Sequence, residues 1–358
     1  MDHLQYINFR LSDLLDADSQ LRIFANGFRF DSADLFKRSS PSEFLPEHSV
    51  SMNDCYGKHH SKGFCKRRVI NHSWEPLELV LDNEFWQIQY IEKLDRDRIG
   101  YDQLVVLHSE RSESSKQLEN GVHWFSHGYL CAEHWYKLYK DIKIVTEYRP
   151  VQSPWICANR LIDGKRAYRL QFLNMLDTSK GTYSLPYEDP QTKRSPKDIF
   201  PNNAVLPSQF DDGANSSAWI TVNQDTPINS AFLHVVTETV IDRIHLTEKI
   251  FKPVVLKQPF VLVGGTGCLE YLKSYGFRTF DNWWSEDYDS IKDDQERMQA
   301  VADIVNWIGA KNISELEKMR NSIKDVLNYN YSHFYKHFGN QCWSELVTNL
   351  RAPDNNSL

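Results

Sequence analysis

The stretch that decides the fold spans residues 231–265 and reads AFLHVVTETVIDRIHLTEKIFKPVVLKQPFVLVGG. It opens with a continuous apolar run at 231–236, which is the pattern of a strand buried on both faces of a parallel sheet. We predict a helix over residues 247–256 and a second buried strand over residues 260–263. Because short apolar strands alternate with a helix, the stretch indicates an α/β fold with a parallel sheet.

The same alternation extends in both directions along the chain. The elements predicted after the stretch are a helix at 268–275, a strand at 277–280 and helices at 294–307 and 313–338. The strands predicted before it lie at 104–107 and 155–158, and the apolar residues 142–145 end the first half of the chain. Residues 183–217 contain five prolines, so we expect a long irregular excursion of the kind that often forms a lid over a site.

Length and hinge signals predict two packed domains in the 358 residues. Pro150 and Pro154 bracket a predicted hinge. We therefore expect an N-terminal domain over residues 1–150, a C-terminal domain over residues 151–335, and a last helix and tail over residues 336–358.

Composition excludes several classes of protein. A hydrophobic share of 41% and a charged share of 25% exclude wholesale disorder and fibrous repeats. The formal net charge of −7 argues against a dedicated non-specific nucleic-acid binder. No apolar run reaches the roughly 20 residues of a membrane span, and residues 1–19 lack a secretory pattern. The six cysteines follow no disulfide or metal spacing, so we expect a soluble cytoplasmic protein.

The chemistry concentrates where the first strand of the stretch ends and its helix begins. Glu238 follows the strand, at the edge where open α/β sheets bind ligands. Thr247 is predicted to cap the helix, which places Glu248 and Lys249 in its first turn beside unpaired backbone N–H groups. Such a helix end attracts phosphate, and a carboxylate there is suited to the two hydroxyls of a ribose. The competing interpretation is a plain helix cap with a solvated lysine.

This segment resembles a known donor-binding motif. Glu238, then Thr-Glu-Lys at 247–249 opening a helix, then an apolar strand ending at Gly264 is similar to the motif of GT-B glycosyltransferases, above all the alpha-1,3-fucosyltransferase family. The segment also resembles segments of uncharacterised bacteriophage proteins. The likeness covers about 35 residues and departs from the family at His245-Leu246 and at 251–253.

The resemblance implies an α/β fold of GT-B type, with two Rossmann-like domains that face a cleft. It implies that Glu248 binds the ribose and Lys249 the phosphates of a nucleotide-sugar, with Glu238 matching the family's strand glutamate. The nucleotide-sugar would be a co-substrate, and neither a cofactor nor a metal is needed. The sugar, the nucleotide and the retention or inversion of stereochemistry stay open.

A second cluster of candidates for the donor follows the strand at 155–158. Guanidinium groups are suited to a diphosphate that becomes the leaving group. The cluster consists of Asn159, Arg160, Arg166 and Arg169. The competing interpretation is a solvated basic face of a helix.

The acceptor side is predicted in the first half of the chain. Glu110 and His127 are the candidate bases for the acceptor hydroxyl. Residues 51–72 form a predicted basic loop, and its candidate acceptor-binding residues are Lys58, Lys62, Arg67 and Arg68. The acceptor is either a glycan or a hydroxymethylated base of phage DNA. The alternative to an enzyme is a non-catalytic phage protein that only binds a nucleotide-sugar.

Three other sequence patterns are weaker evidence of a functional site. The glycine-rich residues 264–267 resemble a dinucleotide loop, but Glu270 stands where a small residue is needed. Cysteines 55 and 65 with the histidines between them lack the paired spacing of a zinc site. The Asp-x-Asp triplets at 95–97 and 287–289 arise readily by chance in an acidic chain.

Overall fold

The computed structural model describes residues 21–25, 49–51, 65–71, 101–109, 111, 121–140, 149–159, 161–162, 164–185 and 227–351. The fold is α/β and contains parallel sheets, as the sequence predicts. The chain forms two compact units. Unit 1 comprises Met1–Leu130 and Asn340–Leu358, and unit 2 comprises Cys131–Gly339.

Unit 1 contains a five-stranded sheet in which every neighbouring pair is parallel. Its strands, in the order β2-β1-β3-β4-β5, are β2 (Ser49–Ser51), β1 (Leu21–Ala25), β3 (Cys65–Asn71), β4 (Tyr101–His108) and β5 (Gly121–His123). The short helix α6 (Ser126–Leu130) follows β5, and α15 (Gly339–Arg351) returns to the unit at the end of the chain.

The prediction of a loop over residues 51–72 is wrong for its second part. Residues 65–71 form strand β3, which pairs with β1 on one side and β4 on the other and carries Arg67 and Arg68. Backbone pairing with two neighbours outweighs the polar composition that suggested a loop. Lys58 and Lys62 lie outside the described residues.

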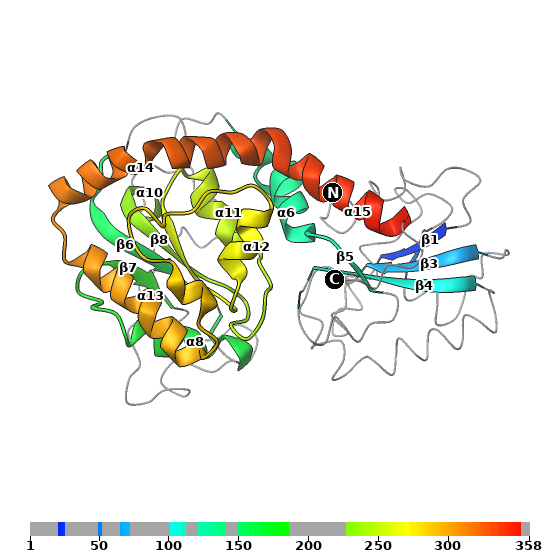
Figure 1. Ribbon diagram of the computed structural model, residues 1–358, viewed down its shortest axis with the longest axis horizontal. Helices are drawn as coiled ribbons and strands as arrows, with labels where there is room; N and C mark the ends of the chain where they lie inside the picture. The colour runs from blue at the N-terminus through cyan, green and yellow to red at the C-terminus, as the bar shows by residue number, and fades with distance from the viewer. Residues whose placement is uncertain are drawn as a thin grey trace. The chain divides into compact units, whose positions relative to one another are not determined.

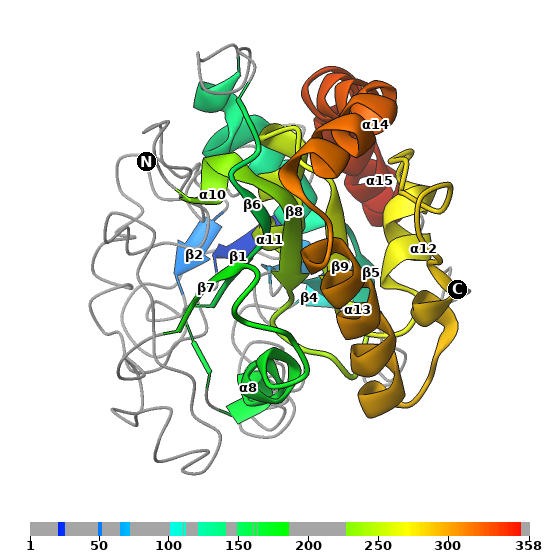
Figure 2. The same ribbon diagram turned by 90° about the vertical axis from the view of Figure 1, so that its left-hand side faces the viewer.

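Unit 2 is built on a four-stranded parallel sheet, whose strands lie side by side in Figure 2. Its strands, in the order β7-β6-β8-β9, are β7 (Thr182–Ser184), β6 (Ser153–Ala158), β8 (Ala231–Thr237) and β9 (Phe260–Val263). Every residue of β8 and β9 is buried, which explains their continuous apolar sequence. The chain steps outward from β6 to β7 and outward the other way from β8 to β9, so the strand order reverses between β6 and β8.

Helices cover both faces of this sheet (Figure 1). The helix α8 (Tyr168–Leu173) packs with α13 (Asp294–Gly309), which also contacts β6 and β9. On the other face, α11 (Glu248–Val255) packs with α14 (Ile313–His333), and both contact β8. The α14 helix continues through the π-helical turn η6 (Phe334–Phe338) into α15, so the predicted helix at 313–338 is longer than its sequence pattern indicates.

The predicted strand at 277–280 is wrong. The segment follows α12 (Cys268–Ser274) as a connection that is neither helix nor strand. Its apolar residues serve the core instead, because the Phe277 ring lies 4.8 Å from that of Phe338 and the Phe280 ring lies 5.0 Å from that of Phe260. A short apolar run therefore indicates that a segment is buried, but a buried segment does not always pair as a strand.

Two predicted elements fall on parts of the chain that the structure does not describe. Residues 142–145, predicted to end the first half of the chain, lie there. So does most of the predicted lid, since only residues 183–185 of 183–217 are described. In the part of the chain that is described, no helix has the length and hydrophobicity needed to cross a membrane.

Candidate functional site

The carboxyl ends of β6 and β8 meet at the point where the strand order reverses. The Thr237 hydroxyl, at the end of β8, donates to Asn159 Oδ1, directly after β6, over 2.7 Å. The Asn159 backbone N–H in turn donates to the hydroxyl of Ser184 at the end of β7 over 3.1 Å. Asn159 therefore ties three strand ends together at the position where open α/β sheets bind their ligands.

Glu238 follows β8 and is fully buried. Its carboxylate accepts two bonds from Thr247, one from the backbone N–H (3.2 Å) and one from the hydroxyl (2.5 Å). Burial raises the pKa of the Glu238 carboxyl, and the nearby Lys249 ammonium partly offsets that rise. The carboxylate thus folds the β8–α11 connection back onto the sheet edge.

Thr247 occupies the N-cap position of α11, but its side chain does not cap the helix. The hydroxyl donates to the Glu238 carboxylate instead, since an ionised acceptor makes a stronger hydrogen bond than a neutral one. The predicted cap is therefore right in position and wrong in its bonding.

Lys249 and Glu248 lie together in the first turn of α11. The Lys249 Nζ donates to Glu248 Oε1 (2.9 Å), to the Thr247 hydroxyl (2.9 Å) and to the Thr239 hydroxyl (3.3 Å). The side chains of Lys249 and Glu248 remain 21% and 9% exposed. A partly exposed ammonium, paired with a buried carboxylate, thus stands at the positive end of a helix, beside the reversal of strand order.

Arg169 has a framework role in the described contacts. It is buried on α8, and its guanidinium donates to the carbonyl oxygens of Leu161 (2.7 Å), Thr237 (3.0 Å) and Glu238 (2.7 Å). The Glu238 carbonyl also accepts the hydroxyl of Tyr168 over 2.5 Å. These bonds hold the main chain at the end of β8, so Arg169 positions the edge and is not a solvated face of a helix.

The structure describes less of the remaining candidates for the donor site, Arg166 and Arg160. Arg166 ends the short 3-10 turn η4 (Gly164–Arg166) and is partly exposed. Arg160 lies outside the described residues. The structure therefore brings Asn159, Arg169, Glu238, Thr247, Glu248 and Lys249 to one edge of the unit 2 sheet.

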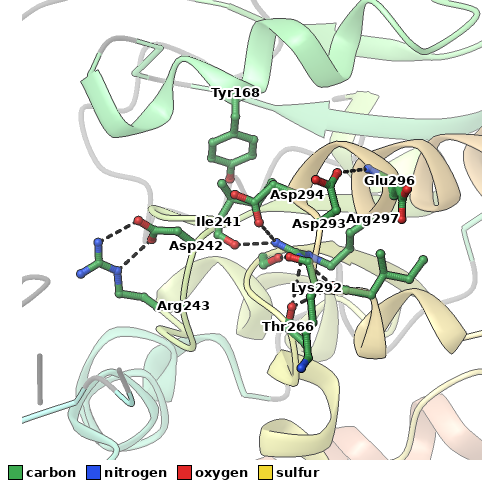
Figure 3. A network of polar contacts seen from close by, with 12 residues as sticks. Tyr168, Ile241, Asp242, Arg243, Thr266, Lys292, Asp293, Asp294, Glu296 and Arg297 are labelled. Atoms are coloured by element: carbon green, nitrogen blue, oxygen red, sulfur yellow. Dashed lines mark hydrogen bonds and ion pairs between the residues drawn. The ribbon is translucent and has the colours of Figure 1, made fainter. Parts of the chain in front are cut away.

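The glycine-rich turn after β9 is occupied by the protein's own groups. The Asp289 carboxylate accepts the N–H groups of Leu269 (2.8 Å) and Glu270 (2.9 Å) at the amino end of α12, where a dinucleotide fold would hold phosphate. Arg297 fixes the turn from the other side by donating to the Gly264 carbonyl and the Thr266 hydroxyl, both over 2.9 Å (Figure 3). The protein's own groups thus occupy the positions at which a dinucleotide-binding loop would hold phosphate.

The second Asp-x-Asp triplet is likewise engaged. Asp289 closes α12, and the Asp287 carboxylate accepts the hydroxyl of Ser285 over 2.8 Å. The triplet at 95–97 and the cysteine and histidine residues at 55–65 are not described, apart from the backbone of Cys65. Within the residues that are described, no three metal-ligating side chains are grouped for a metal ion.

Of the two candidate bases predicted in the first half of the chain, the structure describes only one. His127 lies buried on α6, whereas Glu110 is outside the described residues. The structure adds a pair that the sequence analysis missed, in which His123 Nδ1 lies 3.4 Å from Glu345 Oε1. The one sequence signal for His123 is its place near a strand end. Its partner stands 222 positions later, too far along the chain for any local pattern to connect the two.

No protein-family model matches the chain, and neither a curated protein nor a solved structure is significantly similar to it.

Proposed function

We propose that the protein is a nucleotide-sugar-dependent glycosyltransferase, with a donor site at the carboxyl edge of the unit 2 sheet. The observation that carries the proposal is the pairing of Lys249 with Glu248 in the first turn of α11. The ammonium and the helix end suit a diphosphate, and the carboxylate suits the hydroxyls of a ribose. Glu238 and Asn159 position these groups.

The strand orders support a fold of GT-B type, with two Rossmann-like units, as part of this proposal. The unit 2 sheet has the order β7-β6-β8-β9, in which the second strand along the chain lies outside the first. The first four strands of the unit 1 sheet repeat that arrangement, as β2-β1-β3-β4. A doubly wound sheet of this order binds its ligand where the order reverses.

In the proposed reaction a sugar passes from the nucleotide to an acceptor hydroxyl. Lys249 and the amino end of α11 stabilise the negative charge that develops on the departing nucleotide. We assign the acceptor to unit 1, with a glycan or a hydroxymethylated base of phage DNA as the two classes to test. Lys58, Lys62, Arg67 and Arg68 are the proposed phosphate contacts if the acceptor is DNA.

Thermal shift with UDP, GDP, CMP, ADP and their sugars tests the donor site. We expect one nucleotide to raise the melting temperature of the wild type, because a ligand at 100 times its Kd stabilises the folded state by about 2.7 kcal/mol. Lys249→Ala should lose this rise. Lys318→Ala, which removes an exposed lysine from α14 of the same unit, is the matched control and should keep it.

Two results would contradict the proposal. The first is the absence of a shift with every nucleotide, and the second is an equal shift in Lys249→Ala and Lys318→Ala. Release of free nucleotide from the sugar-linked form then separates an enzyme from a protein that only binds. Binding without release would favour the non-catalytic phage protein.

A further inference from the structure

The lysine of the proposed donor site is engaged by the protein's own groups. Lys249 Nζ donates to Glu248 Oε1 over 2.9 Å and to the hydroxyls of Thr247 (2.9 Å) and Thr239 (3.3 Å). A lysine ammonium has three N–H donors, so these three bonds use all of them. A phosphate therefore binds Lys249 only after one of these acceptors has moved away.

Glu248 is the acceptor whose side chain can move while the backbone stays in place. Thr247 is fixed, because both its backbone N–H and its hydroxyl donate to the Glu238 carboxylate. The backbone of Glu248 is fixed as well, since the buried Tyr136 hydroxyl donates to its carbonyl over 3.2 Å. Opening of the ion pair is thus a rotation of the Glu248 and Lys249 side chains alone.

Burial makes this opening costly unless both charges gain new partners. The side chain of Lys249 is 21% exposed and that of Glu248 only 9%. When a nearly buried ion pair opens, too little water reaches the separated charges to replace the lost bond. In the described part of the chain, Glu248 is the one carboxylate within hydrogen-bond distance of Lys249 Nζ. A ligand that replaces only one partner therefore leaves the other charge unpaired.

We infer that the Glu248–Lys249 pair closes the donor site to phosphate alone and to a nucleoside alone. It opens when one ligand supplies an oxyanion to Lys249 and ribose hydroxyls to Glu248 together. This inference rests on the proposed function and specifies its ligand class, a ribonucleoside diphosphate that is either free or linked to a sugar. Inorganic phosphates and nucleosides are thereby kept from competing for the site.

Titration calorimetry of the wild type with inorganic pyrophosphate tests the inference. The titration is repeated in the presence of saturating uridine, guanosine, adenosine or cytidine. Because a bound nucleoside has already opened the ion pair, the Kd of pyrophosphate should fall about 5-fold or more with the matching nucleoside. The nucleoside should gain the same factor from pyrophosphate. Nucleosides carry no charge, so a direct attraction between the two ligands does not explain such an effect.

Glu248→Gln removes the ion pair and keeps the shape of the side chain. Pyrophosphate should bind this variant about tenfold more tightly than the wild type, because no hydrogen bond to a charged group has to be broken first. The nucleoside should then no longer change the Kd of pyrophosphate. Glu296→Gln, at an exposed position in the first turn of α13 in the same unit, is the matched control and should behave like the wild type.

Lys249→Gln provides the opposite test. It removes the cation that binds phosphate but releases the Glu248 carboxylate, so the nucleoside should bind more tightly than it binds the wild type. Without the inferred role of the pair, the same substitution would leave nucleoside binding unchanged or weaken it. The melting temperature of each variant shows whether it is folded, and the wild-type titrations decide alone where a variant is not.

The outcomes distinguish the inference from the function on which it rests. If pyrophosphate and the nucleoside bind the wild type independently of each other, the inference fails and the proposed function stands on its nucleotide shift. If the wild type binds neither fragment detectably and Glu248→Gln does not bind pyrophosphate either, the inference also fails. If no nucleotide binds the wild type, the proposed function is wrong and this inference falls with it.

Discussion

Thr247 is bonded to Glu238 twice, through its backbone N–H to Oε1 and through its hydroxyl to Oε2. The same hydroxyl accepts a bond from the Lys249 ammonium over 2.9 Å. Thr247 thus lies between a buried carboxylate and the one cation of the first turn of α11. It links the end of β8 to the start of the helix that carries the candidate donor site.

Thr247→Val should destabilise unit 2. The substitution keeps the shape of the side chain but removes the donor to a fully buried carboxylate, and a hydrogen bond to a charged group contributes about 1.5–3 kcal/mol. Thr247→Ser keeps the hydroxyl and should cost less. Chemical unfolding of both variants checks the prediction, and equal losses would contradict it.

His234 should make stability depend on pH. Burial is the main cause that lowers the pKa of this imidazole from 6.5 to about 3, with a contribution from Lys252. Between those values the unfolded chain binds a proton that the folded chain does not bind, so stability falls as the pH falls. The slope reaches about 1.4 kcal/mol per pH unit well below pH 6.5, and from pH 6.5 to pH 5 the loss is about 1.6 kcal/mol.

Unfolding of His234→Gln over the same pH range tests this slope. The variant has no titrating imidazole at residue 234 and should lose that component of the pH dependence. His337→Gln, at an exposed position, should retain the slope of the wild type. Parallel curves for the wild type and His234→Gln would disprove the assignment.

Gly265→Ala should be far more damaging than Gly264→Ala. A β-carbon at residue 265 would lie 2.1 Å from the backbone oxygen of Arg243, which has no freedom to move away as a side-chain end does. At residue 264 the nearest atom is the Cys268 Sγ at 3.2 Å, which needs a shift of a few tenths of an ångström. Overpacking of this kind costs about 1–3 kcal/mol or more. Thermal unfolding of the two variants provides the comparison.

Arg297 should be the strongest single determinant of the turn after β9. It is buried, and its guanidinium donates to the carbonyls of Gly264 (2.9 Å) and Ile241 (2.7 Å) and to the Asp294 carboxylate (Figure 3). Arg297→Met would leave the buried Gly264 carbonyl without this donor, at about 1–3 kcal/mol, and would also remove the donors to the part-buried Ile241 carbonyl and Asp294 carboxylate. We expect a loss of about 3 kcal/mol or more in chemical unfolding.

Two further variants serve as comparisons for Arg297→Met. Arg297→Lys keeps the charge but not the planar fork of donors, so its loss should fall between those of the wild type and Arg297→Met. Lys292→Met changes an exposed neighbour of the same turn and should have little effect. A loss in Lys292→Met as large as that in Arg297→Met would contradict the assigned role.

The fold of unit 2 was predictable where the signal is local. The strands at the two ends of residues 231–263 and the helix between them are confirmed by β8, α11 and β9. Burial of both faces forces a continuous apolar run on such strands, so the sequence carries the signal directly. The same signal failed at 277–280, where the apolar residues pack into the core without a strand partner.

The sequence predicted which residues belong to the candidate site but not which hydrogen bonds they make. The sequence places Glu238 at a strand end and residues 247–249 at a helix start, and the structure brings them together. It does not reveal that Thr247 donates to Glu238 instead of capping α11, or that Arg169 is committed to backbone carbonyls. Hydrogen-bond partners depend on which groups share a buried edge, and a periodic pattern does not encode that.

The sequence by itself determined the α/β class, the buried strands of unit 2 and the polar residues that end them, because periodicity and local spacing follow from burial. Only the tertiary structure decided the strand order that reverses between β6 and β8, the Asp289 carboxylate that closes α12, and the pairing of His123 with Glu345. The physical reason is distance along the chain. Residues separated by 20 to more than 200 positions meet through packing and backbone pairing, which no local stretch of sequence specifies.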